Sequence, residues 1–229
     1  MVINIASSQR LLLFFLHNPG WLRYLPEWRK TIAIKKKQPL ANALDYELLW
    51  VTYGAADKIK KYLKPDMRVY EYSSGGSTLF FAKRVRQVIS VEHDRDWYSG
   101  TLRKIRANHI TNSQLHLVEP EIKTEGQTEY VSQTFPQYKN SSFEKYVKFI
   151  RNYPDAFFDL VLIDGRSRPF CVYESVVKVR PGGYLVLDNS DRNHYQEAIT
   201  SLNKYKRWDY PGFGPFDEAF WQTTIWQIG

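Results

Sequence analysis

The sequence has little cysteine and no long apolar run, and each absence excludes a class of protein. Cys171 is the single cysteine in 229 residues, so an internal disulfide framework is excluded and a reducing compartment suits the chain. The longest apolar run covers only residues 11–16, whereas a membrane-spanning helix needs about 20 residues. No small-residue cleavage site follows that run, so we expect no signal peptide. Together these features predict a cytoplasmic protein.

Acidic residues are also scarce relative to basic ones. The chain has 24 Asp and Glu against 32 Lys and Arg, which gives a formal net charge of +8. Part of the excess is local, because residues 23–37 contain six Lys and Arg residues against one acid, Glu27, and a second basic cluster lies at residues 58–64. A solvated basic surface explains such clusters, and binding of anionic lipid, a phosphorylated sugar or RNA are the alternatives.

The segment before residue 40 is rich in aromatic and basic residues. Residues 10–25 have the composition of an amphipathic helix interrupted at Pro19 and Gly20. We expect this segment to pack on the main domain or on a second subunit. Peripheral contact with a membrane surface is the alternative, and the oligomeric state is left open.

From residue 66 onward, short apolar runs alternate with amphipathic segments. This alternation is typical of an α/β fold with helices on both faces of a parallel sheet. We expect a doubly wound, mostly parallel seven-stranded sheet with an antiparallel edge strand. The expected strands are residues 68–72, 87–91, 115–118, 158–163, 184–187, 207–210 and 223–228. The expected helices are residues 45–63, a segment starting at 77, and residues 95–108, 143–152, 169–179 and 195–204. A long polar stretch at residues 121–141 is expected to be a functional loop.

Five successive expected strands end in polar or acidic residues. Ligands of open parallel sheets bind at the carboxyl ends of the strands, so these residues predict a site at one edge of the sheet. They are Glu71 with residues 73–76, residues 92–94, Glu119, Asp164, and Asp188 with Asn189.

The first of these turns and the second strand end suit a nucleotide. The small residues of the turn at 73–76 let the backbone approach a ligand closely, although a tight turn without a ligand is the alternative. Glu92 follows Glu71 by one strand and one helix, and an acid at this position can accept both hydroxyls of a ribose. The alternative is an acid favoured by a helix N-terminus, a role that suits the expected N-cap Asp94 better.

These segments carry a family resemblance. Residues 69–78, VYEYSSGGST, resemble motif I of the class I S-adenosylmethionine-dependent methyltransferases, and residues 90–94, 158–165 and 181–189 resemble the segments that follow it in that family. The resemblance implies a Rossmann-like domain, which we place at residues 41–229 after an N-terminal extension at residues 1–40. Bacterial O-methyltransferases that act on small molecules or glycans are the nearest in pattern.

The resemblance also implies a role for each strand end. Ser73 and Ser77 stand where motif I usually has glycine. The turn would pass under the methionine portion of S-adenosylmethionine, Glu92 would bind the ribose, and Glu119 would border the adenine. The cofactor-binding residues expected on this basis are Glu71, Ser73, Gly75, Gly76, Glu92, Glu119 and Asp164.

Asp164, Asp188 and Asn189 are similar to the set with which catechol O-methyltransferase and macrocin-type sugar O-methyltransferases hold magnesium. Three oxygen donors suit Mg²⁺, which would lower the pKa of a substrate hydroxyl. The alternative is that Asp164 touches cofactor or substrate directly while the other two cap a helix. Asp164 and His194 are the expected catalytic residues, His194 as a general base.

The expected function is methyl transfer to an oxygen of a small molecule or glycan precursor. Arg166 and Arg168 follow Asp164 and either bind an anionic substrate group or project into solvent. A nucleic-acid substrate is not expected, because no RNA-binding module is visible. The alternatives are an aminopropyltransferase and a non-catalytic module that binds the cofactor or a partner.

Overall fold

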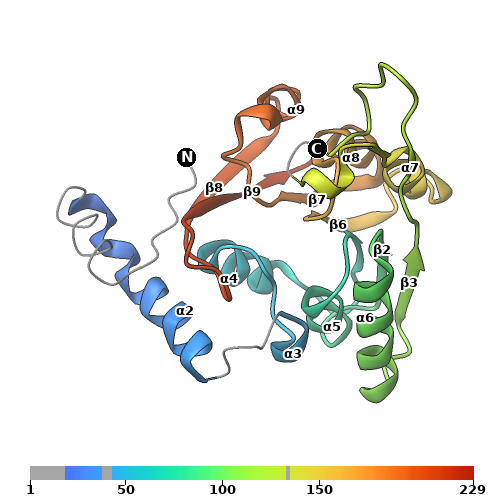
Figure 1. Ribbon diagram of the computed structural model, residues 1–229. Coiled ribbons are helices and arrows are strands. Elements are labelled where there is room, and N and C mark those ends of the chain that lie inside the picture. The colour runs from blue at the N-terminus through green and yellow to red at the C-terminus, as the bar shows by residue number, and fades with distance from the viewer. Residues whose placement is uncertain (1–18, 38–42, 133–134) are drawn as a thin grey trace.

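A seven-stranded sheet forms the centre of the computed structural model, which describes residues 19–37, 43–132 and 135–229 (Figure 1). The strand order is β3-β2-β1-β6-β7-β9-β8. The expected doubly wound, mostly parallel sheet is therefore confirmed. Strand β9 is antiparallel to both of its neighbours, so the antiparallel strand lies one position inside the edge. The strands are β1 (Arg68–Tyr72), β2 (Gln87–Glu92), β3 (Ser113–Leu117), β6 (Phe158–Ile163), β7 (Val179–Leu187), β8 (Lys206–Gly212) and β9 (Trp221–Gln227).

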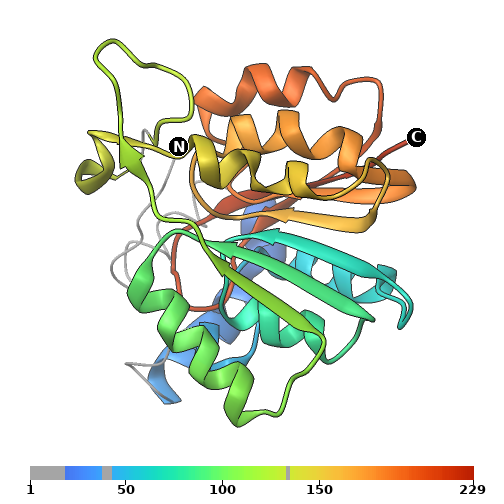
Figure 2. The same ribbon diagram turned by 90° about the vertical axis from the view of Figure 1, so that its right-hand side faces the viewer.

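Helices cover both faces of the sheet (Figure 2). Successive side chains of a strand point to opposite faces, and β6 shows the result. Val161 and Ile163 pack in the core beneath α7, α8 and α9, whereas Leu160 and Leu162 pack in the core with α4 and α5. Both faces are buried, which explains the continuous apolar run of this strand. The main helices are α4 (Tyr53–Tyr62), α5 (Gly76–Ala82), α6 (Arg95–Ala107), α7 (Glu144–Lys148), α8 (Arg168–Ser175) and α9 (Gln196–Thr200).

The continuous helix expected at residues 45–63 is wrong. A short helix α3 (Ala43–Tyr46) ends before Glu47, which has a positive φ of 51°. Leu49 and Val51 are then buried from an extended segment, and α4 starts only at Tyr53. The exposed Trp50 between the buried Leu49 and Val51 departs from helical periodicity, and the apolar run at residues 48–51 gave no sign of it.

The described part of the N-terminal extension packs on the main domain. A 3-10 helix η1 (Pro19–Tyr24) leads into helix α2 (Leu25–Lys37), which was not expected as a helix. Trp21 and Trp28 pack on a small apolar cluster that contains Phe213. Residues 10–18 of the expected amphipathic helix lie outside the described residues. Within the described ranges, no helix is both long and apolar enough to span a bilayer.

The polar stretch at residues 121–141 contains little regular structure. Strand β4 (Glu121–Ile122) pairs with β5 (Ser141–Ser142) in a separate two-stranded sheet, and a 3-10 helix, η2 (Pro136–Tyr138), lies between them. The described part of this stretch is therefore a loop held at its base, and its Tyr130 and Tyr138 pack back against the core.

Candidate active site

The carboxyl ends of four parallel strands line one cleft of about 790 Å³. Strand β1 contributes the turn after Tyr72, β2 contributes Glu92, β6 contributes Asp164, and β7 contributes Asp188. The cleft lies where the chain order reverses, between β1 and β6, which is the place where such sheets bind ligands. Its volume is that of a pocket for a cofactor-sized ligand, about 300–1,000 Å³.

The turn between β1 and α5 has an unusual backbone. Ser73 has a φ of 104° and Gly75 a φ of 139°, a range that glycine adopts freely and that costs other residues about 1–3 kcal/mol. The backbone of Ser73 is therefore strained, because it adopts a positive φ at a position where motif I usually has glycine. A Cβ at Gly75 would lie 2.9 Å from Nε1 of Trp97, so only glycine fits there. Ser73, Gly76 and Ser77 line the cleft, and Trp97 lines it beside them.

Glu92 lies directly beside this turn. Its Oε2 accepts hydrogen bonds from the backbone N–H of Ser74 at 2.9 Å and from Ser74 Oγ at 3.0 Å. Its Oε1 accepts from the backbone N–H groups of His93 and Asp94 at 2.7 and 2.9 Å. These bonds fix the carboxylate at the wall of the cleft. Asp94 is the N-cap of α6, as expected, because its side chain accepts from the N–H of Trp97 at 2.8 Å.

Glu71 is close to the turn but does not line the cleft. Its side chain lies beneath α5, where Oε1 accepts from Ser90 Oγ at 2.6 Å and from Thr78 Oγ1. Its Oε2 is buried and has no hydrogen-bond partner among the described residues. Burial raises the pKa of Glu71 to about 7, although the nearby hydroxyl groups of Ser77, Ser90 and Thr78 oppose the shift. Glu71 therefore holds the turn and the start of α5 in place.

This raised pKa gives an expected pH dependence of stability. An unfolded glutamate loses its proton near pH 4.5 and the folded one near pH 7, so the folded state binds more protons between these values and stability falls as pH rises through them. Relative to a Glu71→Gln variant, the wild-type protein should lose about 3 kcal/mol of unfolding free energy from pH 4.5 to pH 7. Urea denaturation of both proteins at pH 5, 6, 7 and 8 measures the difference. A constant difference across this range would contradict the assigned burial.

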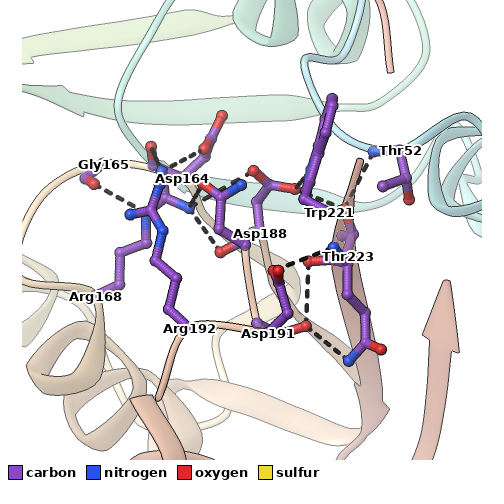
Figure 3. Close-up of polar contacts among 12 residues, drawn as sticks. Thr52, Asp164, Gly165, Arg168, Asp188, Asp191, Arg192, Trp221 and Thr223 are labelled. Carbon is purple, nitrogen blue, oxygen red and sulfur yellow. Dashed lines mark hydrogen bonds and ion pairs between the residues drawn. The ribbon is translucent and has the colours of Figure 1, made fainter. Parts of the chain in front are cut away.

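Arg168 joins the ends of β6 and β7 (Figure 3). The side chain is only 5% exposed. Its guanidinium donates to the carbonyl oxygens of Gly165, Asp164 and Asp188 and to Asn189 Oδ1, at 2.6–3.0 Å, and lies 2.8 Å from Asp164 Oδ1. Five contacts match the five N–H donors of arginine. The guanidinium is therefore fully engaged by the protein.

The two aspartates at these strand ends differ in their surroundings. Asp188 is buried, and its Oδ1 accepts from Trp221 Nε1 at 2.8 Å and from Thr223 Oγ1 at 2.6 Å, which ties β7 to β9. The side chain of Asp164 keeps 25% of its surface exposed and lines the cleft. Burial raises the pKa of Asp164 to about 7, with Arg168 opposing the shift and Asp188 adding to it. Burial also raises the pKa of Asp188, again opposed by Arg168.

The structure does not support the expected magnesium site. Asp164, Asp188 and Asn189 do lie together, but the cationic guanidinium of Arg168 bonds to all three residues. A divalent cation would meet this positive charge and would have to break these bonds. In the described ranges, no group of three His, Cys, Asp or Glu side chains could hold a metal ion. The spacing of the three residues resembled a magnesium-binding set because it does not show that Arg168 lies between them.

Two further expected residues lie away from the cleft. Glu119 follows β3 at the edge of the sheet, where it is 46% exposed and pairs with Arg95, so it does not border the large cleft. His194, in the 3-10 helix η5 (Asn193–Tyr195), lines a smaller pocket next to the cleft. Burial, Arg192 and Arg168 all lower the pKa of His194, so its imidazole is neutral at pH 7.

Several cleft residues were not expected from the sequence. Trp97 lies over Gly75, and its indole donates to the carbonyl oxygen of Ser74. The sequence signal that could have indicated Trp97 is its place in the first turn of α6, the helix that follows Glu92. Leu44, Leu48, Trp50 and Trp97 give the cleft an apolar side, which suits a planar base.

Helix α2 supports another wall of the cleft. Thr31 Oγ1 donates to the carbonyl oxygen of Gly214 at 2.8 Å, and Lys35 forms an ion pair with Glu218 at 2.7 Å. These bonds hold the segment before β9, from which Asp217 and Ala219 line the cleft. The N-terminal extension therefore helps to shape the site.

The chain resembles known proteins in its fold and not in its sequence. No protein-family model and no curated protein matches the sequence. A Klebsiella pneumoniae protein proposed to be an O-methyltransferase is similar in structure, with a TM-score of 0.56 and 14% identity over 89% of this chain and 98% of that one. A Streptococcus mutans protein proposed to be a methyltransferase, in complex with S-adenosylhomocysteine, has a TM-score of 0.52 and 13% identity over 75% and 94% of the two chains. An rRNA methylase from Streptococcus thermophilus has a TM-score of 0.53 and 11% identity over 76% and 94%. At these identities the similarity is one of fold, and the chain has the Rossmann-like α/β fold of these proteins.

Proposed function

We propose that this protein is an S-adenosylmethionine-dependent methyltransferase that transfers the methyl group to an oxygen of a small molecule or glycan precursor. One observation carries the proposal: the carboxylate of Glu92 and the strained turn at Ser73 line the same cleft as Asp164. A carboxylate suited to a ribose and an ionisable group with a pKa of about 7 therefore line one cavity.

The cofactor end of the cleft fits S-adenosylmethionine. The carboxylate of Glu92 would accept hydrogen bonds from the ribose hydroxyls. These hydroxyls would compete with Ser74 Oγ, which donates to Glu92 Oε2. Ser74 Oγ has a second acceptor, because it also contacts Thr101 Oγ1 at 3.2 Å. Trp97 and Trp50 would contact the adenine, and the backbone at Ser73 would face the methionine portion.

The acceptor end of the cleft fits proton removal from a hydroxyl. When bound, S-adenosylmethionine supplies an electrophilic methyl group. Asp164, with a pKa of about 7, would take the proton of the acceptor hydroxyl, because a general base works best with a pKa near the working pH. Arg168 keeps Asp164 in place through Oδ1, and this role replaces the expected metal.

The charges at the acceptor end weigh against an aminopropyltransferase. Arg166, Arg168 and Arg192 all line the cleft. Asp164 and Asp188 line it too, but Arg168 pairs with both, so the other two guanidinium groups would repel a polyamine. The same charges do not weigh against an RNA acceptor, because arginine attracts phosphate. An rRNA methylase also shares the fold. The preference for a small acceptor is therefore a prediction, to be tested with both kinds of substrate.

Binding of S-adenosylhomocysteine to a Glu92→Gln variant tests the cofactor site. The amide nitrogen would face N–H donors and could not accept from the ribose, so the dissociation constant should rise at least about tenfold, which is about 1.4 kcal/mol. Isothermal titration calorimetry measures it, and circular dichroism confirms that the variant is folded.

Glu119→Gln is the matched control, because Glu119 also follows a strand but lies outside the cleft. Its affinity for S-adenosylhomocysteine should equal that of the wild type. Equal affinity of wild type and the folded Glu92→Gln variant would refute the assignment. If the cofactor binds, release of S-adenosylhomocysteine from S-adenosylmethionine in the presence of sugar phosphates, hydroxy acids or RNA identifies the acceptor.

A further inference from the structure

A side pocket of about 40 Å³ adjoins the cleft on the side of Asp164. The two cavities share Arg166, Arg168 and Arg192, which line both. Among the described residues, no Asp or Glu lines the side pocket. Positive charges gathered in a partly buried pocket repel one another, and an anion among them removes this cost.

Arg166 is held in place but keeps an unused donor. Its guanidinium lies 3.9 Å from the centre of the Phe135 ring and 5.4 Å from that of Tyr138, which orients it by cation–π contact. Its Nε is buried and has no hydrogen-bond partner in the described part of the chain. Burial, followed by the charge of Arg168, lowers the pKa of Arg166, although Tyr146, Tyr138 and Asp164 oppose the shift. The positive charge of Arg166 is therefore only partly compensated by the protein.

Ser167 supplies a second unused polar atom in the same pocket. It is 5% exposed, lines the pocket and precedes helix α8. Its buried Oγ has no hydrogen-bond partner within the described ranges. Buried polar groups in native structures almost always have a partner, so a ligand in the pocket would satisfy both Ser167 Oγ and Arg166 Nε.

We propose that this pocket binds an anionic group, a phosphate or a carboxylate, carried by the methyl acceptor. The inference rests on the proposed function, because it assigns the pocket to the substrate of that reaction. Arg166 and Ser167 would donate hydrogen bonds to the anion, and Arg192, which donates to Tyr195 Oη at 3.0 Å, would line its other side. Arg168 would contribute charge alone, since its donors are engaged. The guanidinium fork suits both phosphate and carboxylate.

Anion binding to the full chain saturated with S-adenosylhomocysteine tests the inference. Inorganic phosphate and acetate are titrated separately, and the shift in melting temperature gives the affinity. The wild type should bind at least one of them, and the stronger of the two identifies the anionic group. Arg166→Gln should weaken that binding at least about tenfold, the effect of one charge-assisted hydrogen bond. Arg106→Gln is the control, because it removes the same charge from an exposed position on α6 and should leave anion binding unchanged.

The outcomes separate this inference from the proposed function. Binding of neither anion to the wild type, or equal binding of the stronger anion by wild type and Arg166→Gln, overturns the inference. A loss of S-adenosylhomocysteine affinity in Arg166→Gln, with anion binding retained, also overturns it, since the pocket would then serve the carboxylate of the cofactor. In these three cases the proposed function stands. If the wild type binds phosphate but not S-adenosylhomocysteine, the proposed function fails, and the assignment of the anion to a methyl acceptor fails with it.

Discussion

Replacing Arg168 by methionine should destabilise the protein by about 3–5 kcal/mol, the usual cost of removing one partner from a buried ion pair. The variant would leave the carboxylate of Asp188 buried without its counter-charge, and Asp164 would lose the contact at 2.8 Å. The carbonyl oxygens of three neighbouring residues and Asn189 Oδ1 would also lose their donor. Such a loss is a large part of the stability of a domain, about 5–15 kcal/mol.

Urea denaturation at several pH values measures this effect and identifies its cause. The stability gap between wild type and variant should widen as pH rises through about 7, because Asp164 then carries its charge. A gap that does not change with pH would mean that Arg168 acts by packing alone. Arg151→Met is the matched control: Arg151 forms a two-bond ion pair with Glu174 but is 55% exposed, and its loss should leave the midpoint nearly unchanged.

Replacing Asp164 by asparagine should lower the rate of methyl transfer about 10²–10⁴-fold, the usual contribution of a general base. Asparagine keeps an oxygen for Arg168 but cannot accept a proton at neutral pH. The affinity for S-adenosylhomocysteine should therefore stay within about twofold of the wild type, since a removed base acts on the chemical step. Release of S-adenosylhomocysteine, with the acceptor that reacts fastest, measures the rate.

The pH profile distinguishes a base from a structural residue. Asp164 is protonated below its raised pKa, so the wild-type rate should increase with pH and level off above about 7. The variant should lack this limb. A variant that retains the same pH limb would assign the proton transfer to another group, of which the neutral His194 in the side pocket is the first to examine.

Much of the cofactor side of the cleft could be predicted from local sequence. The turn at residues 73–76 and the strand-ending Glu92 come together because β1 and β2 are adjacent and parallel, which a strand–helix–strand pattern implies. The N-cap role of Asp94 was predicted for the same local reason. The surroundings of Glu119 could not be predicted, because the sequence does not show that β3 is the edge strand, where this side chain is 46% exposed and lies outside the cleft lining.

The sequence by itself determined the alternation of strands and helices, and with it the sheet and the edge at which the polar residues gather. The spacing of apolar residues is a local property, so strands and helices can be predicted from it before the fold is known. Only the tertiary structure decided what lies between Asp164 and Asp188. Arg168 is four residues from Asp164, but its burial also requires Asp188 and Asn189, which follow β7, to lie against it. Because the ends of two adjacent strands meet at Arg168, its guanidinium occupies the position at which the sequence predicted a magnesium ion.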